Sequence, residues 1–160
     1  MKKKSIFLLF FMGLISTISI KAQDKEVTIT VDTLAQNVYM LTGQGGNIGI
    51  YVGETHVFMI DDQFDRLSEK LKTAISSLTD KPIAFLFNTH MHGDHSGGNA
   101  RFNSETVTLV AQDKVRERIQ LNLMPKVEAN EMSAEDYAKM LPEVTFSQDI
   151  TFYDGEETIM

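Results

Sequence analysis

Cysteine is absent from all 160 residues of the sequence. Its absence excludes disulfide bonds in an oxidising compartment and excludes thiolate as a zinc ligand. A lipid anchor on an amino-terminal cysteine is excluded for the same reason. Histidine is also scarce, with four residues and none after His95. A metal site in this sequence must therefore be built from imidazole and carboxylate groups.

Basic residues are few. Lysine and arginine number 15 against 22 acidic residues, which gives a formal net charge of −7. Four of the basic residues lie within residues 1–22, a segment without any acidic residue, so the rest of the chain is still more acidic. Such a surface repels phosphate backbones, and we expect no nucleic-acid partner.

The amino terminus has the pattern of a signal peptide. Lys2 to Lys4 are positively charged, residues 6–20 form an apolar stretch too short to span a bilayer comfortably, and Ala22 is a small residue before Gln23. We therefore predict a signal peptide at residues 1–22 and a periplasmic or secreted protein without stable membrane association after cleavage. A membrane anchor is the alternative, because position 20 is isoleucine where a small residue is preferred.

Hydrophobic periodicity predicts an α/β fold with helices that cover a sheet, in one domain at residues 23–160. A helical pattern spans residues 64–78, with Asp65 as its expected cap, and a capping box at Ser133 predicts a short helix that ends at Pro142. The expected strands are 27–31, 38–41, 48–52, 56–60, 83–87 and 106–111, and the other expected helices are 98–102 and 113–123. Residues 150–160 predict a hairpin with an Asp154-Gly155 turn.

Residues 90–95, with the sequence HMHGDH, place four metal-ligand side chains within six residues. They follow the strand at 83–87, and ligands of layered α/β proteins usually bind beyond the carboxyl ends of strands. In extended backbone His90 and His92 point to the same side, and Gly93 is expected to permit a turn that directs Asp94 and His95 elsewhere. Because neighbouring residues cannot easily share one ion, the cluster predicts two adjacent metals.

This ligand set also predicts a reaction. Neutral imidazole and carboxylate groups suit zinc. Two such cations, about 3.5–4 Å apart, hold a water as hydroxide near neutral pH and polarise a carbonyl or phosphoryl oxygen. The implied reaction is hydrolysis by a metal-bound hydroxide. The alternative is an exposed polar loop that binds metal only adventitiously.

Residues 88–99, NTHMHGDHSGGN, resemble the metal-binding signature of the metallo-β-lactamase superfamily. The flanking segments 45–49, 60–64 and 81–82 also resemble that family, and the similarity covers most of residues 27–123. The resemblance implies a metallo-β-lactamase-like αββα sandwich, present here as its amino-terminal half. It also implies a metallo-hydrolase with two Zn²⁺ ions and a small-molecule substrate.

The resemblance assigns roles to individual residues. His90 and His92 would bind the first zinc ion, and Asp94 and His95 the second. Asp94 would also be catalytic, because it orients the bridging water. Asp61 would support the metal loop from behind. Outside the resemblance, we expect a structural role at a strand edge for His56, and packing rather than substrate contact for Met124, Met132 and Met140.

The sequence also departs from the family. Members complete the two sites with a further histidine, a bridging aspartate and a final histidine, whereas no histidine follows His95. We therefore expect an amino-terminal fragment, incomplete at its carboxy terminus, that folds poorly and is inactive alone. The coding sequence beyond Met160 would test this expectation.

The function expected for the complete protein is that of an exported hydrolase acting on an amide, lactone or ester carbonyl. The alternatives are a glyoxalase II-like thioesterase, a tRNA 3′-processing nuclease, a di-iron redox protein and a non-catalytic metal-binding remnant. The substrate and the oligomeric state stay open.

Overall fold

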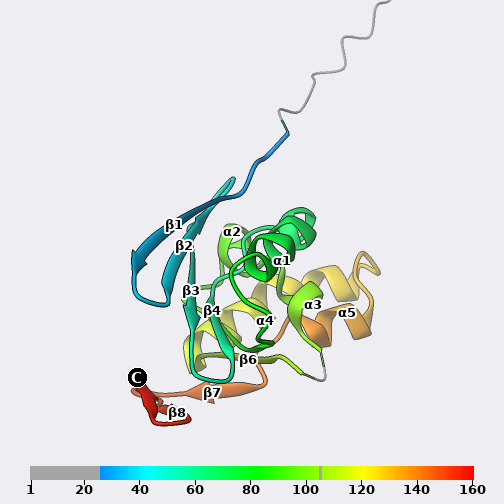
Figure 1. Cartoon of the computed structure of the whole chain (residues 1–160). Coiled ribbons are helices and arrows are strands. Elements are labelled where there is room, and N and C mark those ends of the chain that lie inside the picture. Colours follow the sequence, from blue (N-terminus) through cyan, green and yellow to red (C-terminus); the bar gives the residue numbers. More distant parts are fainter. Residues whose placement is uncertain (1–25, 105) are drawn as a thin grey trace, which may run out of the picture.

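The computed structural model describes residues 26–104 and 106–160, so the predicted signal peptide at residues 1–22 lies outside the described part of the chain. A mixed seven-stranded sheet, with its strands in sequence order, forms the centre of the fold (Figure 1). The strands are β1 (Thr30–Ala35), β2 (Val38–Thr42), β3 (Ile48–Val52), β4 (Val57–Ile60), β5 (Ile83–Asn88), β6 (Thr108–Gln112) and β7 (Val144–Phe146). Strands β1 to β4 each pair antiparallel with the next strand, and β4 to β7 pair parallel.

Helices connect the parallel strands, because a parallel pair needs a crossover rather than a tight turn. They are the 3-10 helix η1 (Asp65–Leu67) and the α-helices α1 (Ser68–Ser76), α2 (Gly93–Ser96), α3 (Asn99–Phe102), α4 (Asp113–Glu128) and α5 (Ala134–Lys139). The helices gather on one side of the sheet in Figure 1. This arrangement confirms the expected α/β class and the mixed sheet of the predicted fold.

The main hydrophobic core lies between the sheet and the first helices. Alternate residues of the central strands, such as Met59 and Leu86, are 0% exposed and belong to the same buried cluster as Leu71 of α1 and Phe102 of α3. A smaller cluster joins β6 to α4 and α5. Met91 packs against it and lies in the metal loop, residues 89–98, which follows β5. The loop that carries the predicted ligands is therefore anchored in a helical core.

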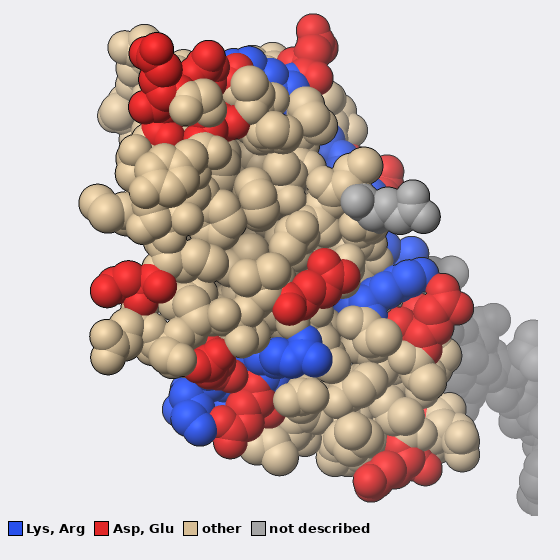
Figure 2. All heavy atoms as spheres, turned by 90° about the horizontal axis from the view of Figure 1, so that it is seen from below, with Lys and Arg blue, Asp and Glu red and all other residues tan. Residues whose placement is uncertain are grey.

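The opposite face of the sheet is aromatic. Phe58, Phe85 and Phe87 point there, since side chains alternate along a strand, and Phe152 packs on all three with ring centroids 4.6–6.1 Å away. Phe152 belongs to a separate hairpin of β8 (Phe152–Asp154) and β9 (Glu157–Ile159). The hairpin covers the face only in part, because Ile60 stays 40% exposed. Figure 2 shows a broad uncharged surface on the side of β7 and the hairpin.

The Asp154 carboxylate fastens this hairpin to the turn between β3 and β4. It is 3% exposed and accepts hydrogen bonds from the Thr55 backbone N–H at 2.9 Å, from the Thr55 hydroxyl and from His56 Nδ1 at 3.0 Å. Burial alone would raise the pKa of Asp154, but these hydrogen bonds outweigh it and hold the pKa well below its ordinary value of 3.8. His56 therefore has a structural role beside β4, as predicted.

Several expected boundaries are wrong. The first strand begins at Thr30 and continues to Ala35, because the turn is made by Gln36 and Asn37, whose φ is 61°. Asp65 is not a helix cap: a 3-10 turn precedes α1, and Asp65 forms an ion pair with Arg101 instead. The closing turn is Gly155-Glu156 rather than Asp154-Gly155, since Asp154 pairs with Glu157 and binds the β3–β4 turn.

For the carboxy-terminal helices, one prediction is wrong and another is confirmed. Helix α4 was expected to end at Leu123 but continues through Pro125 to Glu128. Proline removes one helical N–H, yet its fixed φ is compatible with helix, and its carbonyl accepts the closing bond from the Ala129 N–H at 3.0 Å. The capping box at Ser133 is confirmed, because its hydroxyl accepts from the Asp136 N–H at 3.0 Å.

No helix in residues 26–104 or 106–160 combines the length and the apolar character needed to cross a membrane.

We predict that Asp154→Asn loosens the β8–β9 hairpin. The substitution removes charge-assisted hydrogen bonds, so the free energy of local opening of the hairpin should fall by about 1–3 kcal/mol. The measurement is amide hydrogen exchange at Phe152 and Ile159, which form the next hydrogen-bonded pair of the hairpin after Asp154 and Glu157. Exposed Asp32→Asn is the matched control.

The same variant should change the acid response. Because the folded-state pKa of Asp154 is depressed, its contribution is present above the ordinary value of 3.8 and is lost as the pH falls towards the lower folded value. Protection factors of the wild-type hairpin should therefore decline between pH 5 and pH 2.5, with a smaller decline in Asp154→Asn. An equal decline in both proteins would exclude Asp154 as the clamp.

Candidate metal centre

The strand directions bring three loops to one edge of the sheet. Strand β2 is antiparallel to β3, and β3 to β4, so β2 runs in the same direction as β4, β5 and β6. The carboxyl ends of these strands therefore share an edge. The loops that follow are residues 43–47 after β2, residues 61–64 after β4 and the metal loop, residues 89–98, after β5.

The metal loop brings the predicted ligands together. The chain is extended at His92, with φ −72° and ψ 145°, and helix α2 begins at the next residue. The ring centroid of His90 lies 4.8 Å from that of His92 and 4.0 Å from that of His95. Asp94 Oδ2 lies 3.6 Å from His95 Nε2. The four side chains thus form one cluster that solvent can reach.

Gly93 has a different role from the one expected. It starts α2 without a positive φ, and a Cβ atom added there would meet nothing within 4 Å. The turn that separates the two ligand pairs is therefore helical and does not need glycine. Glycine is needed further on: a Cβ on Gly97 would lie 2.9 Å from the Gln63 carbonyl oxygen, and one on Gly98 2.9 Å from that of Asp62.

Asp61 supports the metal loop from the end of β4. Its side chain is buried, and its carboxylate accepts hydrogen bonds from the Thr89 N–H at 2.8 Å, the Thr89 hydroxyl at 2.7 Å and His95 Nδ1 at 2.7 Å. A ligating histidine commonly donates its second ring N–H to such a carboxylate, which fixes the tautomer and the ring orientation. These contacts are those of the supporting residue that the family resemblance implied.

Two further buried residues hold the loop, and the sequence reasoning assigned them no role. The Asp62 carboxylate accepts from the Gly98 N–H at 2.8 Å, and the Asp62 N–H donates to the His95 carbonyl at 2.9 Å. Burial raises the pKa of Asp62 well above its ordinary value. Gln63 donates from its side-chain amide to the Gly46 carbonyl. The sequence signals for them were the family resemblance of residues 60–64 and a run of polar residues directly after an apolar strand.

An amide pair closes the base of the metal loop. The side chains of Asn88 and Asn99 exchange two hydrogen bonds of 2.9 Å, and Asn99 also donates to the Met140 carbonyl at 2.8 Å. Asn88 ends β5 and Asn99 begins α3, and both are at most 4% exposed. The first and last residues of the family-like motif are therefore tied to each other.

The glycine loop at residues 43–46 packs directly on two of the predicted ligands. The Gly46 N–H donates to the Asp94 carbonyl at 3.3 Å, and a Cβ on Gly46 would collide with the His95 ring. At Gly45, whose φ is +116°, a Cβ would lie 2.8 Å from that of Asp94. Only glycine permits this approach, so the loop fixes the position of Asp94 and His95 from the side opposite Asp61.

The donor set fits zinc. Three imidazoles and the Asp94 carboxylate are borderline ligands of the type that zinc prefers. Among the described residues, Asp61, His90 and His95 offer ligand atoms within 4.8 Å of one another, whereas the predicted ligands His92 and Asp94 lie outside this group. We assign Asp61 to support rather than ligation, because both of its oxygen atoms already accept hydrogen bonds.

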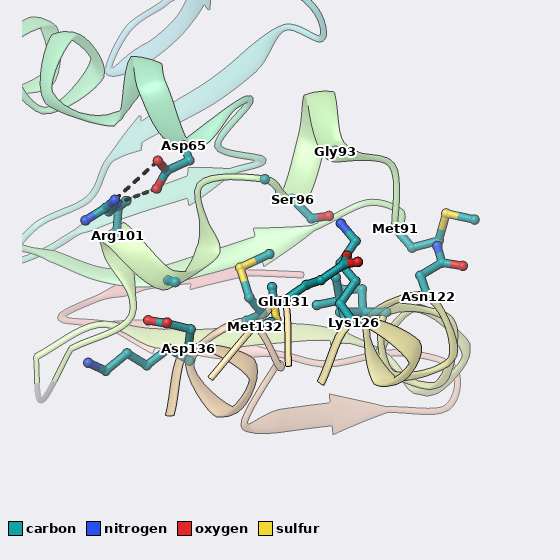
Figure 3. Close-up of a pocket in the computed structure, with 16 residues that line it drawn as sticks. Asp65, Met91, Gly93, Ser96, Arg101, Asn122, Lys126, Glu131, Met132 and Asp136 are labelled. Carbon is teal, nitrogen blue, oxygen red and sulfur yellow. Dashed lines mark hydrogen bonds and ion pairs between the residues drawn. The ribbon is translucent and has the colours of Figure 1, made fainter. Parts of the chain in front are cut away.

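A cavity of about 620 Å³ borders the metal loop (Figure 3). Met91, Gly93 and Ser96 form one wall, and α4 and α5 form the other. Of the three methionines expected to serve packing, Met132 and Met140 line this cavity, whereas Met124 lies on the surface at 41% exposure. The volume is in the range of small-molecule sites.

Comparison with known proteins agrees with this fold and site. Residues 33–159 match the sequence family described as the metallo-beta-lactamase superfamily. The chain therefore belongs to that superfamily, as the motif at residues 88–99 indicated. No curated protein sequence is a significant match.

Solved structures show the same fold. A metallo-beta-lactamase from Pontibacter korlensis superimposes with a TM-score of 0.59 at 21% identity, over 82% of this chain and 58% of its own. The metallo-beta-lactamase FIM-1 from Pseudomonas aeruginosa, in its mono-zinc form, superimposes with a TM-score of 0.58 at 19% identity, over 84% of this chain and 55% of its own. For the metallo-beta-lactamase DIM-1 the TM-score is 0.56 at 16% identity, over 78% of this chain and 54% of its own. The chain thus spans somewhat more than half the length of these proteins.

We predict that Gly46→Ala weakens metal binding whereas Gly93→Ala does not. The added methyl group at Gly46 meets the His95 ring and must displace it, but at Gly93 it meets nothing. Zinc affinity, measured by competition with a chromophoric chelator, should fall at least tenfold in the first variant. Equal affinities in the two variants would show that the glycine loop does not position His95.

Proposed function

We propose that this chain belongs to an exported, zinc-dependent hydrolase that attacks an amide, lactone or ester carbonyl of a small molecule. The observation that carries the proposal is the convergence of His90, His92, Asp94 and His95 at the sheet edge, with His95 held by Asp61. A zinc pair, when bound, supplies Lewis acidity and lowers the pKa of water. Proposed export rests on the signal-peptide pattern of residues 1–22.

In this proposal the residues of the site have separate roles. His90 and His92 hold the first cation, and His95 and Asp94 hold the second. Asp61 keeps the Nδ1 proton of His95 directed inward, so that the Nε2 lone pair faces the site and Asp94. The Asp94 carboxylate, 38% exposed at the mouth of the cluster, is placed to accept a hydrogen bond from water and so orient it.

The proposed substrate class takes its support from the site and from the names of the structural relatives. Three solved neighbours carry the name metallo-beta-lactamase, and one of them is described in a mono-zinc form. Their names favour a β-lactam amide among the candidate carbonyls. The cavity beside Met91 and Gly93 borders the metal loop, but its lining includes none of the four predicted ligands, so it does not define where the substrate binds.

Hydrolysis of a β-lactam, a lactone, a carboxylic ester and a thioester by the full-length protein that contains this chain, with zinc and with iron, tests this proposal. We expect zinc-dependent turnover of at least one of the first three. Turnover of the thioester alone would favour the glyoxalase II-like alternative. Stoichiometric metal without turnover would favour the non-catalytic remnant.

We predict that His90→Ala and His92→Ala each abolish zinc uptake in the complete enzyme, because each removes one imidazole of the first site. The matched control is His56→Ala, which removes a histidine bound to Asp154 and distant in sequence from the metal loop. Metal content measured by mass spectrometry separates these outcomes. Unchanged zinc in both metal-loop variants would overturn the ligand assignment.

A further inference from the structure

A second cavity lies at the same edge of the sheet as the metal loop. Its volume is about 550 Å³, and its walls include Gly43 and Gln44 from the loop after β2, Arg66 and Lys70 from η1 and α1, and Glu26. Since β2 and β4 end at the metal edge, the residues that follow them also lie there. The cavity is therefore a neighbour of the metal loop in the fold.

The two cations in this second cavity differ in their surroundings. Lys70 Nζ lies 3.1 Å from Glu26 Oε1 and donates to the Val27 carbonyl at 2.7 Å, so its charge is neutralised locally. Arg66 has no carboxylate within 4 Å among residues 26–104 and 106–160.

The guanidinium of Arg66 is held in place but has hydrogen-bond donors to spare. Its Nη2 donates to Gln44 Oε1 at 2.8 Å, and its Cζ lies 4.8 Å from the ring centroid of Phe64. These contacts orient the planar group and use one of its five N–H donors. A planar fork of this kind matches the two oxygen atoms of a carboxylate.

The loop at residues 43–46 connects this arginine to the metal loop. Gln44 binds Arg66, and its neighbour Gly45 approaches both Asp94 and Phe64 so closely that a Cβ there would lie 2.8 Å and 2.9 Å from their side chains. Arg66 and the predicted ligand Asp94 thus contact neighbouring residues, Gln44 and Gly45, of one short loop.

We propose that Arg66 binds a carboxylate of the substrate while the scissile carbonyl lies at the metal loop. The substrates are then anions, with the charged group on the side of η1. This inference rests on the proposed hydrolase function and names its substrate class. Arg66 touches no reacting atom, so its effect falls on KM rather than on kcat.

Two esters with the same leaving group test the proposal: 4-nitrophenyl hydrogen glutarate, which is an anion, and neutral 4-nitrophenyl pentanoate. Arg66→Gln should lower the ratio of their kcat/KM values, anionic over neutral, about tenfold and through KM, as expected for the loss of a charge-assisted contact. Arg66→Lys, which keeps the charge without the fork, should restore part of the ratio. Lys72→Gln, which removes a cation that pairs with Glu69, is the control.

An unchanged ratio in Arg66→Gln would overturn the inference. If the wild type hydrolyses neither ester, the proposed function fails for esters, and glutarate alone then tests the anion site. Chemical shifts of Gln44 and of the Arg66 side chain should move on titration of the wild type with glutarate, and those of Gln44 should stay fixed in Arg66→Gln. Equal glutarate affinity in both proteins would overturn the proposal independently of hydrolysis.

Discussion

The carboxylate of Asp61 is the contact on which the metal edge depends. It joins the end of β4 to the start of the metal loop through Thr89 and to its middle through His95, over 28 and 34 residues of sequence. Because Asp61 is 3% exposed, water cannot replace these bonds if the loop moves away. The φ of Asp61 is 61°, which is unfavourable for a non-glycine residue, so the surrounding hydrogen bonds must maintain this conformation.

The glycine loop opposes Asp61 from the other side. Gly46 lies against the His95 ring, and Gly45 lies against Asp94, so the backbone of this loop restricts both predicted ligands. The imidazole of His95 therefore has a hydrogen-bond acceptor at Nδ1 and glycine backbone beside its ring. Such restriction would matter for the proposed hydrolase, since a site held by its supporting residues loses little entropy when it binds metal and substrate.

Local sequence patterns predicted the parts of the fold that depend on neighbouring residues. The strand at Ile83 to Phe87 and the capping box at Ser133 were correct, because burial and capping are short-range properties. Predictions failed where a contact with a residue far away in the sequence determines the local structure. Asp65 caps no helix because Arg101 binds it, and Asp154 lies outside the turn because Thr55 and His56 bind it. The roles of Asp62 and Gln63 likewise require knowledge of which loop lies opposite.

The two faces of the sheet explain why the metal edge can be well defined although part of the sheet stays exposed. The predicted ligands follow β5, whose Leu86 is fully buried among α1 and its neighbours, and Met91 packs against the α4 core. The aromatic face is covered less completely, with Ile60 40% exposed. Burial of the aromatic face therefore adds stability to the sheet. The placement of the predicted ligands depends instead on the helical face and on Asp61.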